Sequence, residues 1–249
     1  MGENRTWVVV ELGPLPAPMA TRLRRQGWRL LMHIDRSGRR SARSVVGTTS
    51  FPVVPATYDS RTALVVVDVQ NDFADPRGSL YVRDGESVVS IVNREAKAAR
   101  TGGALVVTTQ DWHPAVTPHF AKDGGIWPVH CVAESWGAEL HPDLDVEGAG
   151  RILKGSGGED GYSGFSMVHP VTGDKSTTGL DETLRSRGIE RVVVLGLATD
   201  YCVKETALDA VRLGYDTTVI LDGVRPVERE PGDGQRAVDA MADAGVALE

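Results

Sequence analysis

A cluster of possible metal ligands lies in the middle of the chain. Asp111, His113, His119 and His130 form the pattern D-x-H-x5-H-x10-H. Nitrogen and oxygen donors of this kind suit zinc, iron or manganese. Because one acid and three histidines leave positions for water or a ligand on a five- or six-coordinate ion, the pattern predicts an open site for one divalent metal ion. Ordinary polar loop groups are the alternative, and Cys131 is a less favoured ligand because adjacent side chains usually diverge.

Three other residues are suited to covalent chemistry. Cys202 follows a Thr-Asp pair, either residue of which can cap a helix, and the first turn of a helix favours a thiolate. A partly desolvated Asp68 can take the thiol proton, and the charge of Lys154 can favour both the carboxylate and the thiolate. The amides of Ala198 and Cys202 can face the oxyanion that forms on an attacked carbonyl. Together these residues predict a cysteine nucleophile.

Each residue also has a plainer interpretation when it is considered alone. Asp68 can cap a loop, and an isolated lysine such as Lys154 before a glycine-rich loop is usually a solvated surface group. Cys202 can be a small buried hydrophobic residue. The catalytic hypothesis therefore depends on whether the fold brings the three side chains together.

From about residue 60 the chain alternates apolar runs with amphipathic segments. Apolar runs of strand length predict strands at 61–68, 104–111, 151–154, 191–197 and 216–222. Helical spacing predicts helices at 87–103, 178–188, 199–215 and 234–245, and Thr178 with Asp181 forms a possible capping box for the second of them. This alternation predicts an α/β fold: a three-layer, doubly wound, mostly parallel sheet with helices on both faces.

The candidate residues fall at one edge of this predicted sheet. Asp68, Asp111 and Lys154 end three strands, and Cys202 comes just after a fourth. Open parallel sheets bind ligands beyond the carboxyl ends of their strands. We therefore expect residues that are far apart in the sequence to converge on one crevice.

Composition and charge exclude several classes of protein. The 249 residues carry a formal net charge of −7, and no run approaches the length of a membrane span. The acidic main part offers no basic stripe for a phosphate backbone, so we expect it to bind neither nucleic acid nor membrane. The two cysteines are better interpreted as free thiols than as a disulfide, and the N-terminus lacks a secretory signal pattern, so we expect a cytoplasmic protein.

Residues 1–58 differ from the rest of the chain. They are rich in arginine and carry a net positive charge, whereas residues 59–249 carry the acidic excess. The arginine and serine content predicts a poorly ordered, dispensable extension or an organelle-targeting segment. The stretches "TWVVVEL" and "WRLLMHI" are nevertheless compatible with short strands. Residues 59–249 are expected to form a single domain.

Five stretches of this main part resemble a known family. They are "LVVVDVQNDF", "DWHPAVTPHF", "WPVHCV", "KGSGGEDGYSGF" and "GLATDYCVKETALDAV". In this order they are similar to the nicotinamidase/pyrazinamidase branch of the isochorismatase-like cysteine hydrolases, over about residues 60–249. Tyr201 is a departure, because many relatives have histidine or another residue before the nucleophile.

The resemblance implies a role for each motif position. It implies Asp68, Lys154 and Cys202 as a catalytic triad, and Asp111, His113 and His130 as metal ligands, with His119 as a neighbouring or positioning residue. It also implies that Phe73, Trp127 and Tyr162 line an aromatic-ring pocket, and that the Leu197–Ala198 peptide bond is cis. The implied reaction is hydrolysis of nicotinamide, and of pyrazinamide by analogy, through a thioester on the cysteine.

Two other functions remain open from the sequence. One is an amidohydrolase of the same superfamily that acts on a carbamoyl or maleamate-type substrate; such relatives generally lack this metal-ligand loop. The other is a non-enzymatic metal-binding or docking module that has kept the fold, since one fold hosts many functions. The presence of all three triad residues disfavours the second.

Overall fold

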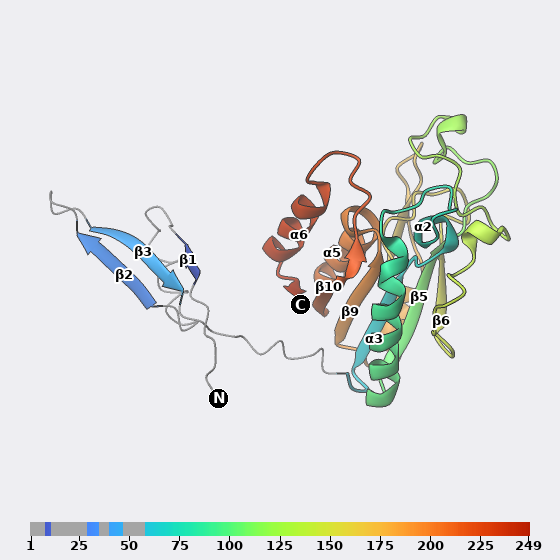
Figure 1. Cartoon of the computed structure of the whole chain (residues 1–249). Coiled ribbons are helices and arrows are strands. Elements are labelled where there is room, and N and C mark those ends of the chain that lie inside the picture. Colours follow the sequence, from blue (N-terminus) through green and yellow to red (C-terminus); the bar gives the residue numbers. More distant parts are fainter. Residues whose placement is uncertain (1–7, 11–28, 35–39, 47–57) are drawn as a thin grey trace. The chain divides into compact units, whose positions relative to one another are not determined.

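The computed structural model describes residues 8–10, 29–34, 40–46 and 58–249 of a chain that divides into two compact units, Met1–Val54 and Pro55–Glu249. Within the described residues, the first unit contains an antiparallel sheet in the order β1-β3-β2 (Figure 1). Its strands are β1 (Val8–Val10), β2 (Arg29–Ile34) and β3 (Arg40–Val46). Strands thus occur in both stretches in which the sequence allows them, and β3 lies in the arginine- and serine-rich stretch where none is predicted. The remainder of the expected poorly ordered extension lies outside the described residues.

The second unit is built on a six-stranded sheet whose neighbouring strands are all parallel, in the order β11-β10-β9-β4-β5-β6. The strands are β4 (Thr62–Val67), β5 (Leu105–Asp111), β6 (Gly150–Lys154), β9 (Arg191–Leu197), β10 (Asp216–Arg225) and β11 (Ala247–Leu248). The chain runs outward from β4 through β5 to β6, and then returns to β9 on the other side of β4. The switch in strand order between β4 and β9 is where open sheets of this kind form a crevice.

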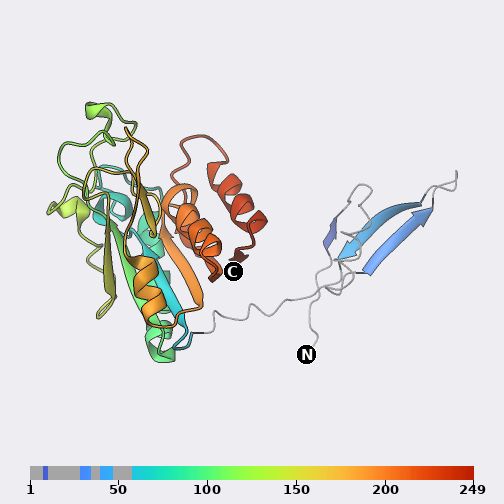
Figure 2. The ribbon, with the colours of Figure 1, turned by 180° about the vertical axis from the view of Figure 1, so that it is seen from behind.

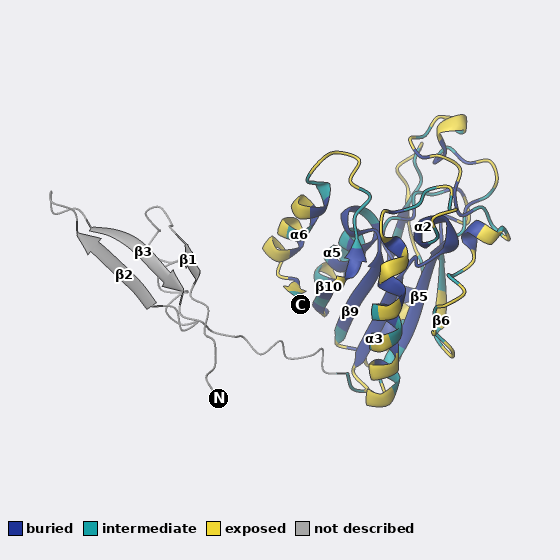
Figure 3. Cartoon of the chain, in the orientation of Figure 1, coloured by how far each residue is buried: buried dark blue, intermediate teal, exposed yellow. Residues whose placement is uncertain are grey.

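Helices cover both faces of this sheet, which confirms the predicted three-layer architecture (Figures 1 and 2). Helix α3 lies on one face, α4 and α5 lie on the other, and α6 packs against α5. The helices are α3 (Val88–Gly102), α4 (Leu180–Ser186), α5 (Lys204–Arg212) and α6 (Asp233–Asp243). Helix α3 has exposed residues on the side that faces away from the sheet, whereas the central strands are buried (Figure 3).

The core is made by the apolar strands and the inner stripes of the helices. Every residue of β4 is buried, and α3 buries Val88, Val92 and Ala96 at helical spacing. Such spacing places one stripe of the helix against the sheet. None of the helices in the described part of the chain has both the length and the apolar character needed to cross a membrane.

Several short elements are absent from the sequence-based prediction. In the second unit they are the edge strand β11, helix α2 (Asn71–Ala74), the 3-10 turns η1 (Gly85–Ser87), η2 (Ala121–Asp123) and η3 (Trp136–Ala138), and the hairpin strands β7 (Ser166–Val168) and β8 (Lys175–Thr177). A further turn, the π-helical η4 (Thr199–Val203), begins the segment predicted as one helix at 199–215. These pieces are too short for hydrophobic periodicity to reveal them.

The predicted capping box of α4 is wrong. Gly179, with φ +84°, stands at the cap position, and the Thr178 hydroxyl accepts a hydrogen bond from the Leu180 amide at 3.2 Å. Asp181 does not return to the cap, because its carboxylate accepts hydrogen bonds from Arg185 and Tyr215.

Tyr58 is the first described residue of the second unit. Tyr58 belongs to it, because the Tyr58 hydroxyl donates a hydrogen bond of 3.0 Å to Glu95 on α3. The Tyr58 backbone also lies where a side chain on Gly102 would sit. Tyr58 is therefore part of the compact unit Pro55–Glu249.

Candidate active site and metal centre

The candidate triad converges at the carboxyl edge of the sheet, as the fold requires. Asp68 directly follows β4, Lys154 ends β6, and Cys202 lies in η4 just after β9. All three side chains are buried. Asp68 has φ +48°, a left-handed conformation that is uncommon for a residue other than glycine and clusters at functional sites.

Lys154 is the centre of a buried hydrogen-bond network. Its Nζ donates to Asp68 Oδ2 at 2.7 Å and to Asp111 Oδ1 at 2.8 Å, and also to the Gly161 carbonyl. The same Nζ lies 3.7 Å from Cys202 Sγ. A single ammonium group thus contacts the candidate base, the candidate nucleophile and one candidate metal ligand.

The two carboxylates around Lys154 have different proton affinities. Burial raises the pKa of Asp68 to about 6, although the Lys154 charge and the hydrogen bond from Thr109 Oγ1 to Asp68 Oδ1 (2.6 Å) act in the opposite direction. Burial also acts to raise the pKa of Asp111, but the charges of Lys154, His113 and His130 outweigh it and bring that pKa to about 2. Asp68 is therefore the carboxylate suited to exchange a proton near neutral pH.

Cys202 is a buried thiol at rest. Burial raises its pKa well above the ordinary value, and a hydrogen bond with Asp68 raises it further, whereas Lys154 lowers it. Desolvation thus outweighs both the charge of Lys154 and any favourable effect of the helical turn on the thiolate. A base must take the thiol proton, and the Cys202 sulfur lies within 4.8 Å of a carboxylate oxygen of Asp68. The Leu197–Ala198 peptide bond just before this turn is cis, as predicted.

Cys202 is one of the residues that line a pocket. Its walls include the three predicted ring-pocket residues, Phe73, Trp127 and Tyr162, and both predicted oxyanion residues, Ala198 and Cys202. Trp127 Nε1 donates a hydrogen bond of 2.8 Å to the Tyr162 hydroxyl, which holds two of the aromatic walls together. The pocket also reaches the metal-site residues Asp111, His119 and His130.

Sequence reasoning missed several walls of this pocket. They are Leu80, Val82, Gly161 and Val227, and Tyr201 joins them although it was noted only as a departure from the family pattern. Leu80 and Val82 follow Phe73 closely in the sequence, and this proximity to a predicted pocket residue could have indicated them. Val227 lies beyond the end of β10, and only the rule that ligands bind at this sheet edge points to it.

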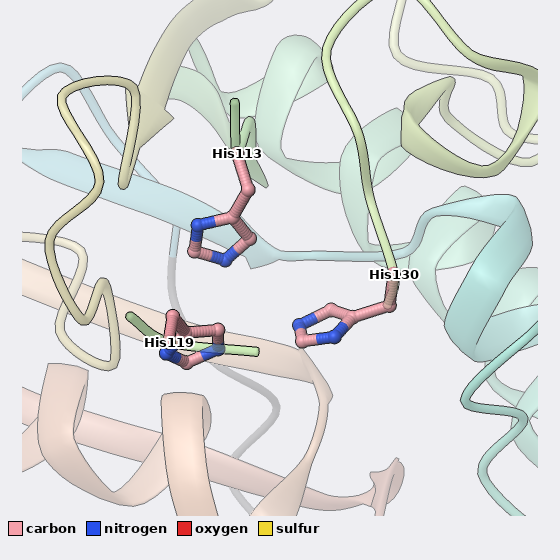
Figure 4. A group of neighbouring side chains, drawn as sticks. All are labelled: His113, His119 and His130. Carbon is pink, nitrogen blue, oxygen red and sulfur yellow. The ribbon is translucent and has the colours of Figure 1, made fainter. Parts of the chain in front are cut away.

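The three histidines of the candidate metal centre face one another across a common space (Figure 4). Each offers a ring nitrogen, and these nitrogens lie within 4.8 Å of one another. Asp111 Oδ2 completes the group, because it lies 3.9 Å from Nε2 of His113 and 3.9 Å from Nε2 of His130. The structure thus brings together all four residues of the predicted pattern.

The chemistry of these residues fits a metal ion. Both ring nitrogens of His113 lack a hydrogen-bond partner among the residues that the structure describes, although the ring is fully buried, and such unpaired groups are costly unless they bind something. Burial lowers the pKa of His113 to about 4 and also lowers the pKa of His130, so both rings are neutral and able to donate a lone pair. Gly155 has φ +72° and would place a side chain 2.5 Å from the His113 ring, so glycine leaves the ring its room.

Cys131 does not join this centre. Its Sγ lies 3.8 Å from the Gly137 carbonyl, and burial raises the pKa of its thiol well above the ordinary value. The sequence-based preference against it agrees with this placement, because neighbouring side chains diverge at His130 and Cys131.

Gln70 is a positioning residue that the sequence did not reveal. Its buried side chain grips the Asp111 backbone, since Nε2 donates to the Asp111 carbonyl and Oε1 accepts from the Asp111 amide, both at 2.8 Å. Nε2 also donates to the Ala138 carbonyl at 2.9 Å. The orientation of Asp111 is therefore set by a residue from the neighbouring strand's end.

The fold and the site together define a cysteine hydrolase with an α/β fold. An isochorismatase domain model matches residues 62–248, so the chain belongs to the isochorismatase family. It is 40% identical over 203 residues to the nicotinamidase of Escherichia coli (strain K12), covering 75% of this chain and 93% of that protein.

Two solved structures have the same fold. The chain is similar to the pyrazinamidase of Pyrococcus horikoshii in complex with zinc, with 38% identity, a TM-score of 0.67, and coverage of 76% of this chain and 98% of that chain. It is also similar to PnC1 from L. infantum in complex with nicotinate, with 36% identity, a TM-score of 0.70, and coverage of 78% and 94% respectively.

Proposed function

We propose that this protein is a nicotinamidase, which hydrolyses nicotinamide to nicotinate and ammonia and also accepts pyrazinamide. The observation that carries the proposal is a single pocket with aromatic walls, which is lined by Cys202 and by the metal-site histidines His119 and His130. Such a pocket can hold a flat pyridine carboxamide with its carboxamide group at the Cys202 sulfur and its ring nitrogen at the metal site. The names of the similar proteins, nicotinamidase and pyrazinamidase, support the same substrate class.

Asp68 begins the reaction by taking the proton of the Cys202 thiol, whose sulfur lies within 4.8 Å of its carboxylate. The sulfur attacks the carboxamide carbon, and the amides of Ala198 and Cys202 are placed to stabilise the resulting oxyanion. Asp68 then returns the proton to the amine, ammonia leaves, and a thioester on Cys202 remains. Water attacks the thioester with Asp68 again as the base, nicotinate leaves, and the thiol is restored.

Lys154 keeps this proton exchange in place. Its ammonium group holds the Asp68 carboxylate at 2.7 Å and lies 3.7 Å from the Cys202 sulfur, so it stabilises negative charge on whichever of the two has lost the proton. The pocket walls Phe73, Trp127 and Tyr162 enclose the aromatic ring and exclude water from the sulfur.

The residues that would hold a divalent ion are Asp111, His113, His130 and His119. When bound, the ion supplies a Lewis-acidic position for the ring nitrogen of the substrate, which orients the ring. Zinc is the ion we propose, supported by the zinc complex of the similar pyrazinamidase. A cytoplasmic location belongs to the same proposal, and the two free cysteines fit a reducing compartment. The first unit, Met1–Val54, is proposed to be dispensable for the chemistry.

Ammonia release from nicotinamide by the purified protein tests the proposal. Turnover should be lost in Cys202→Ala and after removal of the metal by a chelator, and it should return when zinc is added back to the chelated wild type. Folded, zinc-loaded protein that releases no ammonia from nicotinamide would overturn the assignment. Carbamoyl and maleamate-type amides would then be assayed.

A further inference from the structure

His119 is held in place by a residue from a different loop. Its Nδ1–H donates a hydrogen bond of 2.5 Å to Asp160 Oδ1. His119 is 4% exposed and the Asp160 side chain is 25% exposed, so the bond lies at the edge of the buried centre. Asp160 lies in the glycine-rich loop that follows β6, which is the loop that also supplies Gly161 to the Lys154 network.

A second bond ties the same two loops together. The Thr117 hydroxyl donates to the Gly158 carbonyl at 2.9 Å and accepts from the His119 amide at 3.2 Å. The backbone and the ring of His119 are therefore both fixed by contacts that join the loop carrying His119 to the glycine-rich loop after β6. This leaves the ring little freedom to turn.

The bond to Asp160 occupies Nδ1, so Nε2 is the nitrogen left for a ligand. The His119 ring stacks on the His113 ring, with centroids 4.4 Å apart, and lies 5.3 Å from the His130 ring. Figure 4 shows the three rings around one common space, in which their ligand nitrogens lie within 4.8 Å of one another.

We propose that Asp160 is a positioning residue for the metal centre, which accepts the Nδ1–H of His119 and thereby directs His119 Nε2 at the ion as a direct ligand. Carboxylates that orient metal-bound histidines in this way fix the ring and raise its basicity. The inference rests on the metal site of the proposed function, but it does not depend on which amide the enzyme hydrolyses. The competing explanation is a loop contact in which Asp160 stabilises the fold without affecting the ion.

Zinc affinity distinguishes these explanations. It is measured by competition with a chromophoric chelator for the wild type, for Asp160→Ala, Asp160→Asn and Asp160→Glu, and for Glu159→Gln as a matched change on the same loop. Asp160→Ala should weaken zinc binding by about 10- to 100-fold. Asp160→Asn keeps an acceptor oxygen and should lose less, and Asp160→Glu should recover part of the loss. Glu159→Gln, whose wild-type carboxylate accepts only the Gly157 amide among the described residues, should bind zinc as the wild type does.

The cobalt-substituted proteins supply a second readout. If His119 is a direct ligand, His119→Ala changes the visible ligand-field spectrum of bound Co²⁺, and Asp160→Ala changes it in the same direction. A wild-type zinc affinity together with a wild-type spectrum in Asp160→Ala would overturn the proposal. Should Asp160→Ala fail to fold, Asp160→Asn decides the question in the same two measurements.

The two proposals fail in different ways. A protein that hydrolyses nicotinamide but binds zinc equally well with and without the Asp160 carboxylate contradicts only the positioning role. A protein that loses zinc affinity in Asp160→Ala but never releases ammonia from nicotinamide contradicts only the proposed activity.

Discussion

Lys154 and Asp111 form a buried ion pair in which Lys154 Nζ donates to Asp111 Oδ1 at 2.8 Å. The other oxygen of Asp111 lies 3.9 Å from His113 Nε2 and faces the candidate metal centre. One carboxylate thus belongs to both the proposed proton-transfer network and the proposed metal site. Changes on one side are therefore expected to affect the other.

Removal of the lysine charge should reduce the stability of the protein and abolish turnover. Lys154→Met leaves the Asp68 and Asp111 carboxylates buried without their cation, and breaking a buried pair in this way costs about 3–5 kcal/mol. The free energy of unfolding from urea denaturation should fall by that amount, and turnover should be lost. Lys175→Met, at an exposed position on β8, is the matched control and should change the free energy of unfolding by no more than about 0.5 kcal/mol.

The pH dependence of catalysis should report Asp68. Because its pKa in the folded protein is about 6 and the reaction needs the carboxylate form, kcat/KM should fall about tenfold per pH unit below pH 6. Thr109→Val removes a hydrogen bond that lowers this pKa, so its acid limb should move to higher pH. A profile that is flat from pH 5 to 8 would contradict the assignment of Asp68 as the base.

The same shift predicts the effect of pH on stability. The pKa of Asp68 is higher in the folded protein than its ordinary value of 3.8, so the folded state binds the proton more tightly. The contribution of Asp68 to stability is therefore greatest below pH 3.8 and is lost as pH rises through about 6. Compared with Asp68→Asn, the wild type should lose stability over that interval, which urea denaturation at several pH values measures.

Gln70 should matter to the metal site although it contacts none of the candidate ligand atoms. Gln70→Leu leaves the Asp111 amide and carbonyl without their side-chain partners, at a cost of about 1–3 kcal/mol for each buried group left unpaired. We expect lower stability and weaker zinc binding, measured by denaturation and chelator competition. Gln235→Leu on the exposed side of α6 is the control, and equal zinc affinities in the two variants would contradict the positioning role of Gln70.

Asp200 should control the fit of the substrate through a loop. Its buried carboxylate accepts the amides of Val227 and Glu228 at 2.8 and 2.9 Å, and Val227 is a wall of the pocket. Asp200→Ala releases this wall without touching the sulfur, so KM for nicotinamide should rise by about tenfold, which corresponds to a loss of about 1.4 kcal/mol of binding. A fall in kcat with unchanged KM would show instead that Asp200 acts on the nucleophile turn. Asp222→Ala, at an exposed position on β10, is the control.

Shortening the chain tests the division into two units. A protein that begins at Pro55 keeps Tyr58 and its hydrogen bond to Glu95. It should retain the kcat/KM and the thermal stability of the full chain's hydrolase unit. A protein that begins at residue 59 should be less stable, because it loses that contact. Loss of folding in the chain that begins at Pro55 would contradict the proposed dispensability of the first unit.

Much of this protein could be predicted from the sequence alone, because the features concerned are local or periodic. Continuous apolar runs predict the buried parallel strands, and the end of each run places Asp68, Asp111 and Lys154 at one edge of the sheet. The spacing of Asp111, His113, His119 and His130 suffices to predict a ligand group. The cis peptide bond at Leu197–Ala198 follows from the resemblance to the family and is present.

The tertiary structure alone decided how these groups act on one another. Desolvation depends on every element packed around a side chain, so the rise in the pKa of the Cys202 thiol on burial could not be predicted from the sequence. Contacts between distant loops have no local signal, so the Gln70 grip on Asp111 and the bond between His119 and Asp160 emerged only from the folded chain. The sequence determined which chemical groups reach the sheet edge, and three-dimensional packing determined their charges, orientations and partners.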